Sequence, residues 1–257
     1  MLVSHATVIR WVPEPAIIPD TALYVKDGLI AAIGPSAELE ARYPAAQRLD
    51  AAGQWLLPGL ICAHTHMYGA FARGMALPGE APASFPEILR QLWWRLDRAL
   101  GYDDIRYSAL VVLADAIRHG VTTLFDHHSS PTATRFSLDA LAEAVDEAGV
   151  RASLCYELSD RDGPEAAAAG IAENVRFLES PRAHTPMLRG MFGLHASMTL
   201  SDLTIARAVE AERSFGVGFH VHVAESEADV AETLRRHNVR VVERWAHFGV
   251  LGPRTIA

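Results

Sequence analysis

The chain has 257 residues, of which 50% are hydrophobic, 8% aromatic and 21% charged. These values are ordinary for a globular protein and allow one large domain, or a barrel with a small second domain. The formal net charge of -8 argues against nonspecific binding to nucleic acid or to an anionic membrane.

The two cysteines and the N-terminus bear on the cellular location. Cys62 and Cys155 lie in apolar runs without a Cys-x-x-Cys motif, so we expect inert buried thiols rather than a disulfide or a thiolate metal site. The first residues lack the basic start and long apolar stretch of a signal peptide, and no apolar run approaches the ~20 residues of a membrane span. We therefore expect a cytoplasmic protein.

The first 56 residues alternate short β-like runs with turns. Strands are predicted over residues 3–12, 22–25 and 29–33, and residues 50–57 close the section. Asp27-Gly28 stands between two alternating runs and predicts a hairpin turn. We expect residues 1–56 to form a small β-domain, the β-sandwich part of a composite domain.

From residue 57, apolar strand-like runs alternate with amphipathic helical stretches, which indicates parallel βα units. Strands are predicted over residues 57–63, 122–126, 151–156, 188–194 and 218–223. Helices are predicted over residues 85–99, 103–119, 137–148, 165–178, 201–215, 227–236 and 240–248. Residues 252–257 resemble the opening of a sixth strand.

The predicted fold class is therefore α/β, with a (β/α)8 barrel of the TIM type, incomplete here, over residues 57–257. Five to six βα units do not close an eight-stranded barrel, which takes ~250 residues by itself. A half-built barrel would expose strand edges and an apolar interior. We expect the barrel to be completed by residues outside this sequence.

The first chemical motif is a pair of histidines, His64 and His66, at the end of the first barrel strand. Strand side chains repeat every two residues, so both imidazoles point to one side and can share a divalent ion. A bare His-x-His is more often a pair of surface histidines. Here it follows an apolar strand that starts with Pro58-Gly59, which favours metal ligation.

The second motif, His220-Val-His222-Val-Ala-Glu225, ends the fifth strand. One of its histidines can supply a third metal ligand. Glu225 can reach the same pocket from the following loop and move a proton from metal-activated water to a leaving nitrogen. Standing alone, Glu225 would be read as a solvated loop residue.

Further polar residues follow the other strands. His195, at the end of the fourth strand, is as consistent with a core histidine as with a residue that hydrogen-bonds a substrate carbonyl or ring nitrogen. Asp126, His127 and His128 follow the second strand, where support of the ligands, contact with substrate and a purely structural role are all open. Trp93-Trp94 belongs to a helix and mostly packs in the core, although one indole could wall a flat pocket.

Together these motifs resemble the amidohydrolase superfamily. Pro-Gly-x-x-x-x-His-x-His after a small β-domain, and His-x-x-Glu at the fifth strand, carry the resemblance. They are most similar to its cytosine-deaminase-like branch of chlorohydrolases and aminohydrolases. The stretches LWWRLDRAL, FDHHSSP and HVHVAE resemble aminohydrolases of the SsnA type, and the resemblance covers essentially the whole chain.

The resemblance implies roles for individual residues. His64, His66 and His222 match the metal ligands, Glu225 matches the catalytic glutamate, and His195 matches a substrate-contacting histidine. The family pattern also implies a histidine on a sixth strand and a metal-binding aspartate on an eighth strand, both beyond the last residue. We therefore expect little or no turnover from the 257-residue chain itself.

The single lysine separates subclasses of this superfamily. Binuclear members often bridge two metals with a carboxylated lysine on strand four, but that strand reads LRGMFGL here and Lys26 lies in the β-domain. This favours a mononuclear site that holds one divalent ion, most readily Zn²⁺, with Fe²⁺ as the alternative.

The resemblance predicts hydrolytic deamination of a purine-, pteridine- or pyrimidine-like heterocycle by metal-activated water. Glu225 would protonate the ring nitrogen, and His195 would orient the substrate. A chlorohydrolase or N-alkylamine hydrolase with the same site, and a non-catalytic module of the same fold, stay open as alternatives. The expected partner is a small heterocycle, without nucleic acid or membrane, and the sequence leaves homo-oligomerisation open.

Overall fold

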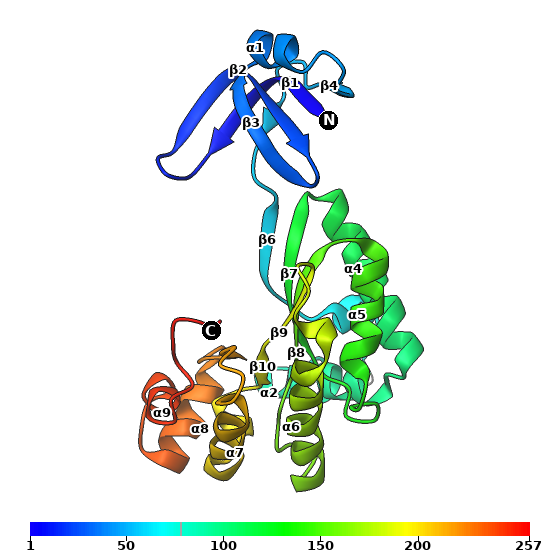
Figure 1. Cartoon of the computed structure of the whole chain (residues 1–257). Coiled ribbons are helices and arrows are strands. Elements are labelled where there is room, and N and C mark those ends of the chain that lie inside the picture. The colour runs from blue at the N-terminus through cyan, green and yellow to red at the C-terminus, as the bar shows by residue number, and fades with distance from the viewer. Residues whose placement is uncertain (78) are drawn as a thin grey trace. The chain divides into compact units, whose positions relative to one another are not determined.

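The computed structural model of the chain describes residues 1–77 and 79–257, which divide into two compact units, Met1–Gly59 and Leu60–Ala257 (Figure 1). Among the described residues, no helix combines the length and the apolar character that a bilayer crossing requires.

The first unit is one five-stranded sheet with a short helix. Its strands are β1 (Leu2–Arg10), β2 (Ala16–Lys26), β3 (Leu29–Pro35), β4 (Arg48–Asp50) and β5 (Trp55–Leu56). The order is β3-β2-β1-β4, with β5 also paired to β1. Strands β1 to β3 are antiparallel, whereas β4 and β5 run parallel to β1. Whether this sheet belongs to a sandwich stays a prediction.

The hairpin between β2 and β3 is confirmed at the predicted turn. Asp27 and Gly28 both have positive φ, 52° and 75°, as a two-residue turn of the favoured twist requires. Helix α1 (Ser36–Arg42) was not predicted, since seven residues are too few to show a helical period. Its Leu39 packs with Leu2 and Ala22 in the small core of this unit.

The second unit is built on parallel strands in sequential order. They are β6 (Leu60–Thr65), β7 (Val121–His128), β8 (Arg151–Tyr156), β9 (Leu188–Gly190), β10 (Phe192–Leu194) and β11 (Phe219–Val221). One sheet has the order β6-β7-β8-β9, and β10 pairs with β11 in a second. A parallel bridge from His220 to Ile256 continues the series, which confirms the predicted order of parallel βα units.

Helices follow the strands as the βα pattern predicts. The longer ones are α4 (Tyr102–Arg118), α5 (Ser137–Ala148), α6 (Pro164–Glu179), α7 (Asp202–Glu212), α8 (Glu227–His237) and α9 (Val241–His247). Short helices and turns are η1 (Met67–Ala72), η4 (Pro181–Ala183) and η5 (Ser197–Thr199). Helix α5 shows how the pattern works: Leu138, Leu141 and Val145 are buried on one face, and Gly149 ends the helix at φ 69°.

The helix predicted over residues 85–99 is not a single α-helix. It consists of α2 (Phe85–Ile88), the π-helical η2 (Leu89–Trp93), α3 (Trp94–Leu96) and the 3-10 turn η3 (Asp97–Ala99). Sequence periodicity does not distinguish these forms, because each keeps the backbone near the helical region. π-helical turns occur frequently at functional sites, and this one precedes Trp94 in the wall of a cavity.

The strand predicted over residues 188–194 is interrupted at Met191, where the chain changes partner from β8 to β11. At this point the side chain of Asn174 replaces strand pairing. Its Oδ1 accepts hydrogen bonds from the backbone N–H groups of Tyr156 (2.9 Å) and Gly193 (3.3 Å). Its Nδ2 donates to the Tyr156 carbonyl at 2.8 Å. The buried polar groups at the junction are thereby satisfied.

We predict that Gly193→Ala destabilises the protein by about 2–3 kcal/mol, because the added Cβ would collide with the backbone carbonyl of Tyr156. Gly252→Ala is the matched control, since its Cβ would meet nothing within 4 Å, and should change stability by less than about 0.5 kcal/mol. Urea unfolding of both variants measures the difference. Equal stability of the two would contradict the packing described for Gly193.

Candidate functional site

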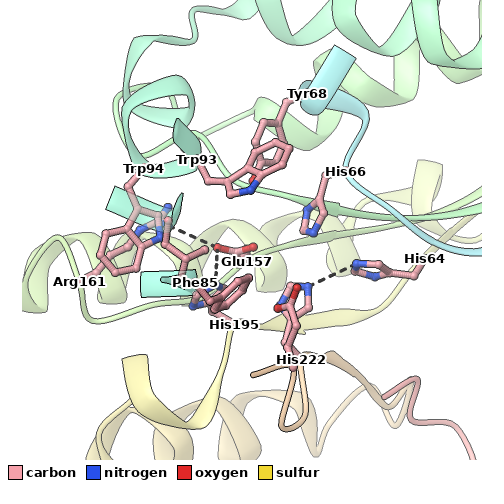
Figure 2. A pocket seen from close by; sticks show the side chains of 12 residues that line it. His64, His66, Tyr68, Phe85, Trp93, Trp94, Glu157, Arg161, His195 and His222 are labelled. Atoms are coloured by element: carbon pink, nitrogen blue, oxygen red, sulfur yellow. Dashed lines mark hydrogen bonds and ion pairs between the residues drawn. The ribbon is translucent and has the colours of Figure 1, made fainter. Parts of the chain in front are cut away.

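The ends of β6, β8, β10 and β11 bring polar side chains to one cavity of the second unit (Figure 2). Its lining residues are His64, His66, Tyr68, Phe85, Leu89, Trp93, Trp94, Glu157, Arg161, His195, His222 and Glu225. The cavity volume is about 140 Å³, below the ~300–1,000 Å³ of pockets for drug-sized ligands. The described walls therefore suit one small ring system.

Three histidines from two distant segments converge at this cavity. His64 and His66 come from the end of β6, and His222 directly follows β11. Their ligand nitrogens all lie within 4.8 Å of one another. The Nε2 atoms of His64 and His222 are 3.3 Å apart and face each other, as Figure 2 shows.

Hydrogen bonds determine which nitrogen of each ring is free. His66 Nδ1 lies 2.6 Å from the carbonyl oxygen of His127, which can only accept, so Nδ1 carries the proton and Nε2 keeps its lone pair. His64 Nδ1 lies 2.8 Å from Nε2 of His220. Contacts of this kind orient histidine ligands toward a metal.

The three imidazoles fit a divalent cation. A tetrahedral zinc site with Zn–N bonds of about 2.0–2.1 Å separates two nitrogen ligands by about 3.3–3.4 Å, close to the distance between His64 and His222. Burial, followed by the nearby His127, lowers the pKa of His66 to about 3 and that of His222 well below its usual range. Neutral imidazoles with free lone pairs are what a zinc or iron ion requires.

Glu225 lies at the edge of the cavity and is itself exposed. The preceding Ala224 has φ 52°, and its N–H donates to Asp229 Oδ2 at 3.1 Å, which bends the chain after β11. Partial burial raises the pKa of Glu225, and the charges of Glu157 and Asp229 raise it further. The carboxyl group therefore holds a proton more readily than a free glutamate does.

His195 is buried beside the cavity with a defined tautomer. The hydroxyl of Thr199 donates to the Ala196 carbonyl at 3.0 Å, so its oxygen accepts the bond of 2.6 Å from His195 Nδ1. Burial lowers the pKa of His195 to about 4, which keeps the ring neutral. The Nε2 lone pair of His195 is therefore an acceptor at the cavity.

The last residues of β7 support the site from behind. Asp126 is fully buried and its Oδ1 accepts the Met67 N–H at 2.6 Å, which holds the chain immediately after His66. Burial raises the pKa of Asp126 to about 7. His128 bonds to the Ser130 hydroxyl at 2.9 Å and does not line the cavity. Of the roles that the sequence left open, the structure favours a supporting role for Asp126.

Sequence reasoning missed three polar residues of the site: His220 as a partner of His64, and Glu157 and Arg161 in the cavity wall. Glu157 directly follows β8, so the rule that barrel sites lie at strand ends would have found it. Arg161 carried no such signal, because it lies four residues further along a loop.

Aromatic side chains line the same cavity as the histidines (Figure 2). They are Tyr68, Phe85, Trp93 and Trp94. Both tryptophans line the cavity, whereas the sequence suggested that at most one indole would do so. Flat apolar walls with few polar groups suit a planar ring that is held by its edge.

We predict that His220→Ala lowers the affinity of the protein for Zn²⁺ by about 10–100-fold, because residues that orient a ligand typically contribute this much. Competition with a chromophoric chelator measures the affinity. His119→Ala is the control, since His119 is exposed at the end of α4 and should leave the affinity unchanged. Equal affinities of the two variants would show that the contact with His64 has no part in metal binding.

Two family models match parts of this chain. Residues 55–257 match the family model described as amidohydrolase family. Residues 22–46 match a second model, an imidazolonepropionase-like composite domain of bacteria.

Curated relatives match the whole chain. It is 29% identical to a 5'-deoxyadenosine deaminase of Methanosarcina mazei and 31% identical to a 5-methylthioadenosine/S-adenosylhomocysteine deaminase of Syntrophobacter fumaroxidans. Each match covers 100% of this chain and 56% of the relative, so the chain spans little more than half the length of these proteins.

Solved structures share the fold. An adenosine deaminase from Xanthomonas campestris with bound zinc has a TM-score of 0.79 at 22% identity, covering 100% of this chain and 56% of that one. Guanine deaminase of E. coli has a TM-score of 0.81 at 18% identity, covering 99% and 61%. Because a family model matches most of its length, this chain belongs to the amidohydrolase family.

Proposed function

We propose that the whole protein is a metal-dependent hydrolase that cleaves a non-peptide C–N bond and releases ammonia from an amino-substituted nitrogen heterocycle. The observation that carries the proposal is the convergence of three neutral imidazoles beside a carboxyl group in one aromatic-walled cavity. The curated relatives named above are deaminases of adenosine-like compounds, which supports the same reaction class.

In this proposal His64, His66 and His222 hold one divalent cation, with Zn²⁺ favoured by the all-nitrogen donor set. When bound, such a cation supplies a Lewis acid and makes water nucleophilic at neutral pH. The chain keeps the three imidazoles unprotonated by burial, and the His127 carbonyl directs Nε2 of His66 toward the site.

Glu225 is proposed to move the proton. Its raised pKa lets the carboxyl group deliver a proton to the ring nitrogen beside the carbon under attack, and its exposed position allows it to exchange protons with solvent. His195 is proposed to fix the orientation of the ring, because its Nε2 lone pair accepts a hydrogen bond from a ring N–H.

The test is an assay of ammonia release by the whole zinc-loaded protein on a panel of aminopurines, aminopyrimidines and aminopteridines. Chlorinated and N-alkylated versions of the same rings are included. We expect ammonia from at least one amino ring, at one bound metal ion per chain. Release of chloride or alkylamine without ammonia from any ring would overturn the assignment as a deaminase.

A further inference from the structure

A buried carboxylate, Glu157, occupies the middle of the cavity wall and has no role in the function proposed above. It directly follows β8 and is only 4% exposed. Figure 2 shows it at the centre of the lining residues, with its carboxylate flanked by Arg161 and His195. Burying a carboxylate costs free energy unless its oxygens accept hydrogen bonds.

One oxygen of Glu157 is satisfied within the protein. Its Oε2 lies 3.1 Å from His127 Nδ1. The other ring nitrogen of His127, Nε2, lies 3.1 Å from the carbonyl oxygens of both Leu194 and His220. Both nitrogens of this ring face acceptors only, so both donate. Glu157 Oε2 therefore receives a charge-assisted hydrogen bond that fixes the carboxylate in place.

The other oxygen, Oε1, has no hydrogen bond among the described residues. Its nearest polar neighbours are His195 Nε2 and Arg161 Nη1, both at 3.7 Å, which is beyond hydrogen-bonding distance. The guanidinium of Arg161 is held at this distance by the bonds of its other two nitrogens, Nη2 and Nε. It forms an ion pair with Asp97, donates to Ser129 at 2.8 Å and contacts Asp162 at 3.2 Å.

His195 Nε2, which lies as close to Oε1 as Arg161 Nη1 does, is also an acceptor. The neutral tautomer of His195 presents the Nε2 lone pair, because Nδ1 donates to Thr199. Two acceptors 3.7 Å apart thus line the cavity without a donor between them. The bond from His127 to Oε2 and the guanidinium of Arg161 near Oε1 both favour the charged form of the Glu157 carboxylate.

We propose that Glu157 Oε1, together with His195 Nε2, selects substrates that present an N–H donor edge on the ring that carries the leaving amine. This inference rests on the proposed deaminase function and specifies its substrate class. Oxygen and nitrogen acceptors of Glu157, His195 and His222 lie within 4.8 Å of one another. A donor bound by Glu157 is therefore one or two ring positions from the reacting carbon, on the same ring.

The energetic reason for selection is the unsatisfied carboxylate. A ring with an exocyclic amine or ring N–H at this edge donates to Oε1 the hydrogen bond that it does not receive from the described residues. A ring that places a C–H or a lone pair there leaves Oε1 of the buried carboxylate without a hydrogen bond. Sites built to bond a substrate N–H can reject analogues that lack it by about 10⁴–10⁵-fold.

The same atoms permit one other interpretation, a second cation held by Glu157, His195 and His222. The donor-edge proposal is preferred because His222 Nε2 already faces His64 and Glu157 Oε2 is taken by His127. The metal content of the protein decides between them. Two bound ions in the wild type, with one lost in Glu157→Gln, would overturn the proposal.

The closing experiment compares matched rings on the whole zinc-loaded protein. The pairs are 2,6-diaminopurine with adenine and isocytosine with 2-aminopyrimidine, in which only the first member has the additional donor. We expect kcat/KM to favour the donor ring of at least one pair by about a hundredfold or more. Parity within both pairs would overturn the proposal.

The variant Glu157→Gln keeps the shape of the side chain and removes its charge. We expect it to retain zinc and to reduce the donor-ring preference at least tenfold, mainly through KM. Glu173→Gln is the matched control, because Glu173 is also a buried carboxylate but bonds the start of α5 away from the cavity. It should leave the preference unchanged. Equal loss on both members of a pair would reduce Glu157 to a structural role and overturn the proposal.

Binding separates this proposal from the deaminase assignment. Trp93 and Trp94 line the cavity, so quenching of tryptophan fluorescence reports ring binding without turnover. If no ring yields ammonia, the deaminase function fails, while tighter binding of donor rings by wild type than by Glu157→Gln still supports the donor edge. If Glu157→Gln does not fold, the wild-type pair comparison decides alone.

Discussion

His66→Ala is expected to abolish ammonia release and to remove stoichiometric zinc from the protein. Its Nε2 carries the lone pair that the bond from Nδ1 to the His127 carbonyl keeps free, and the substitution leaves only two of the three proposed ligands, His64 and His222. Loss of a metal's several kcal/mol of charge stabilisation lowers the rate at least about a thousandfold.

Zinc content by atomic absorption and an ammonia assay measure the effect, and His247→Ala is the control because His247 is exposed on α9. A thermal shift gives a second readout. Added zinc should raise the melting temperature of the wild type and the control, but not that of His66→Ala. Full activity or full zinc content in His66→Ala would show that the three imidazoles do not form the metal site.

Glu225→Gln is expected to lower kcat by about 10²–10⁴-fold, the usual contribution of a positioned general acid or base. The amide cannot carry the proton, but it keeps the size of the side chain. Glu225 is not one of the three proposed metal ligands, so the zinc content and the stability of the variant should stay at wild-type values. Steady-state kinetics together with zinc analysis separates this loss from loss of metal.

Glu227→Gln is the matched control, as Glu227 is an exposed carboxylate two residues further along the chain. It should leave kcat within about a factor of two, like most surface substitutions. If Glu225→Gln retained its kcat while His66→Ala lost activity, the metal site would stand and the proton-transfer role would move to another group.

The βα order of the second unit was predictable because strands and helices differ in the period of their apolar residues. Helix α5 was predicted at its observed bounds, Ser137–Ala148, and β8 at Arg151–Tyr156. Local pattern does not report which form a helical stretch takes. Residues 85–99 therefore divide into α, π and 3-10 segments that the periodicity did not indicate.

The spacing of His64 and His66 by itself predicted two imidazoles on one side of a strand end, since that relation depends only on the strand repeat. The sequence also identified His222, Glu225 and His195 through position after a strand and through resemblance. All five side chains line the same cavity, although their assigned roles stay predictions.

Only the tertiary structure showed which atoms meet. His64 and His222 are 158 positions apart in the chain, yet their Nε2 atoms lie 3.3 Å apart. The free oxygen of Glu157 likewise follows from where Arg161 and His127 direct their donors. Local residue types determine the period of an element and the chemistry available at its end. Packing between distant elements determines which histidine nitrogen carries the proton and which polar atoms have no hydrogen bond within the protein. It therefore determines which groups can bind a ligand.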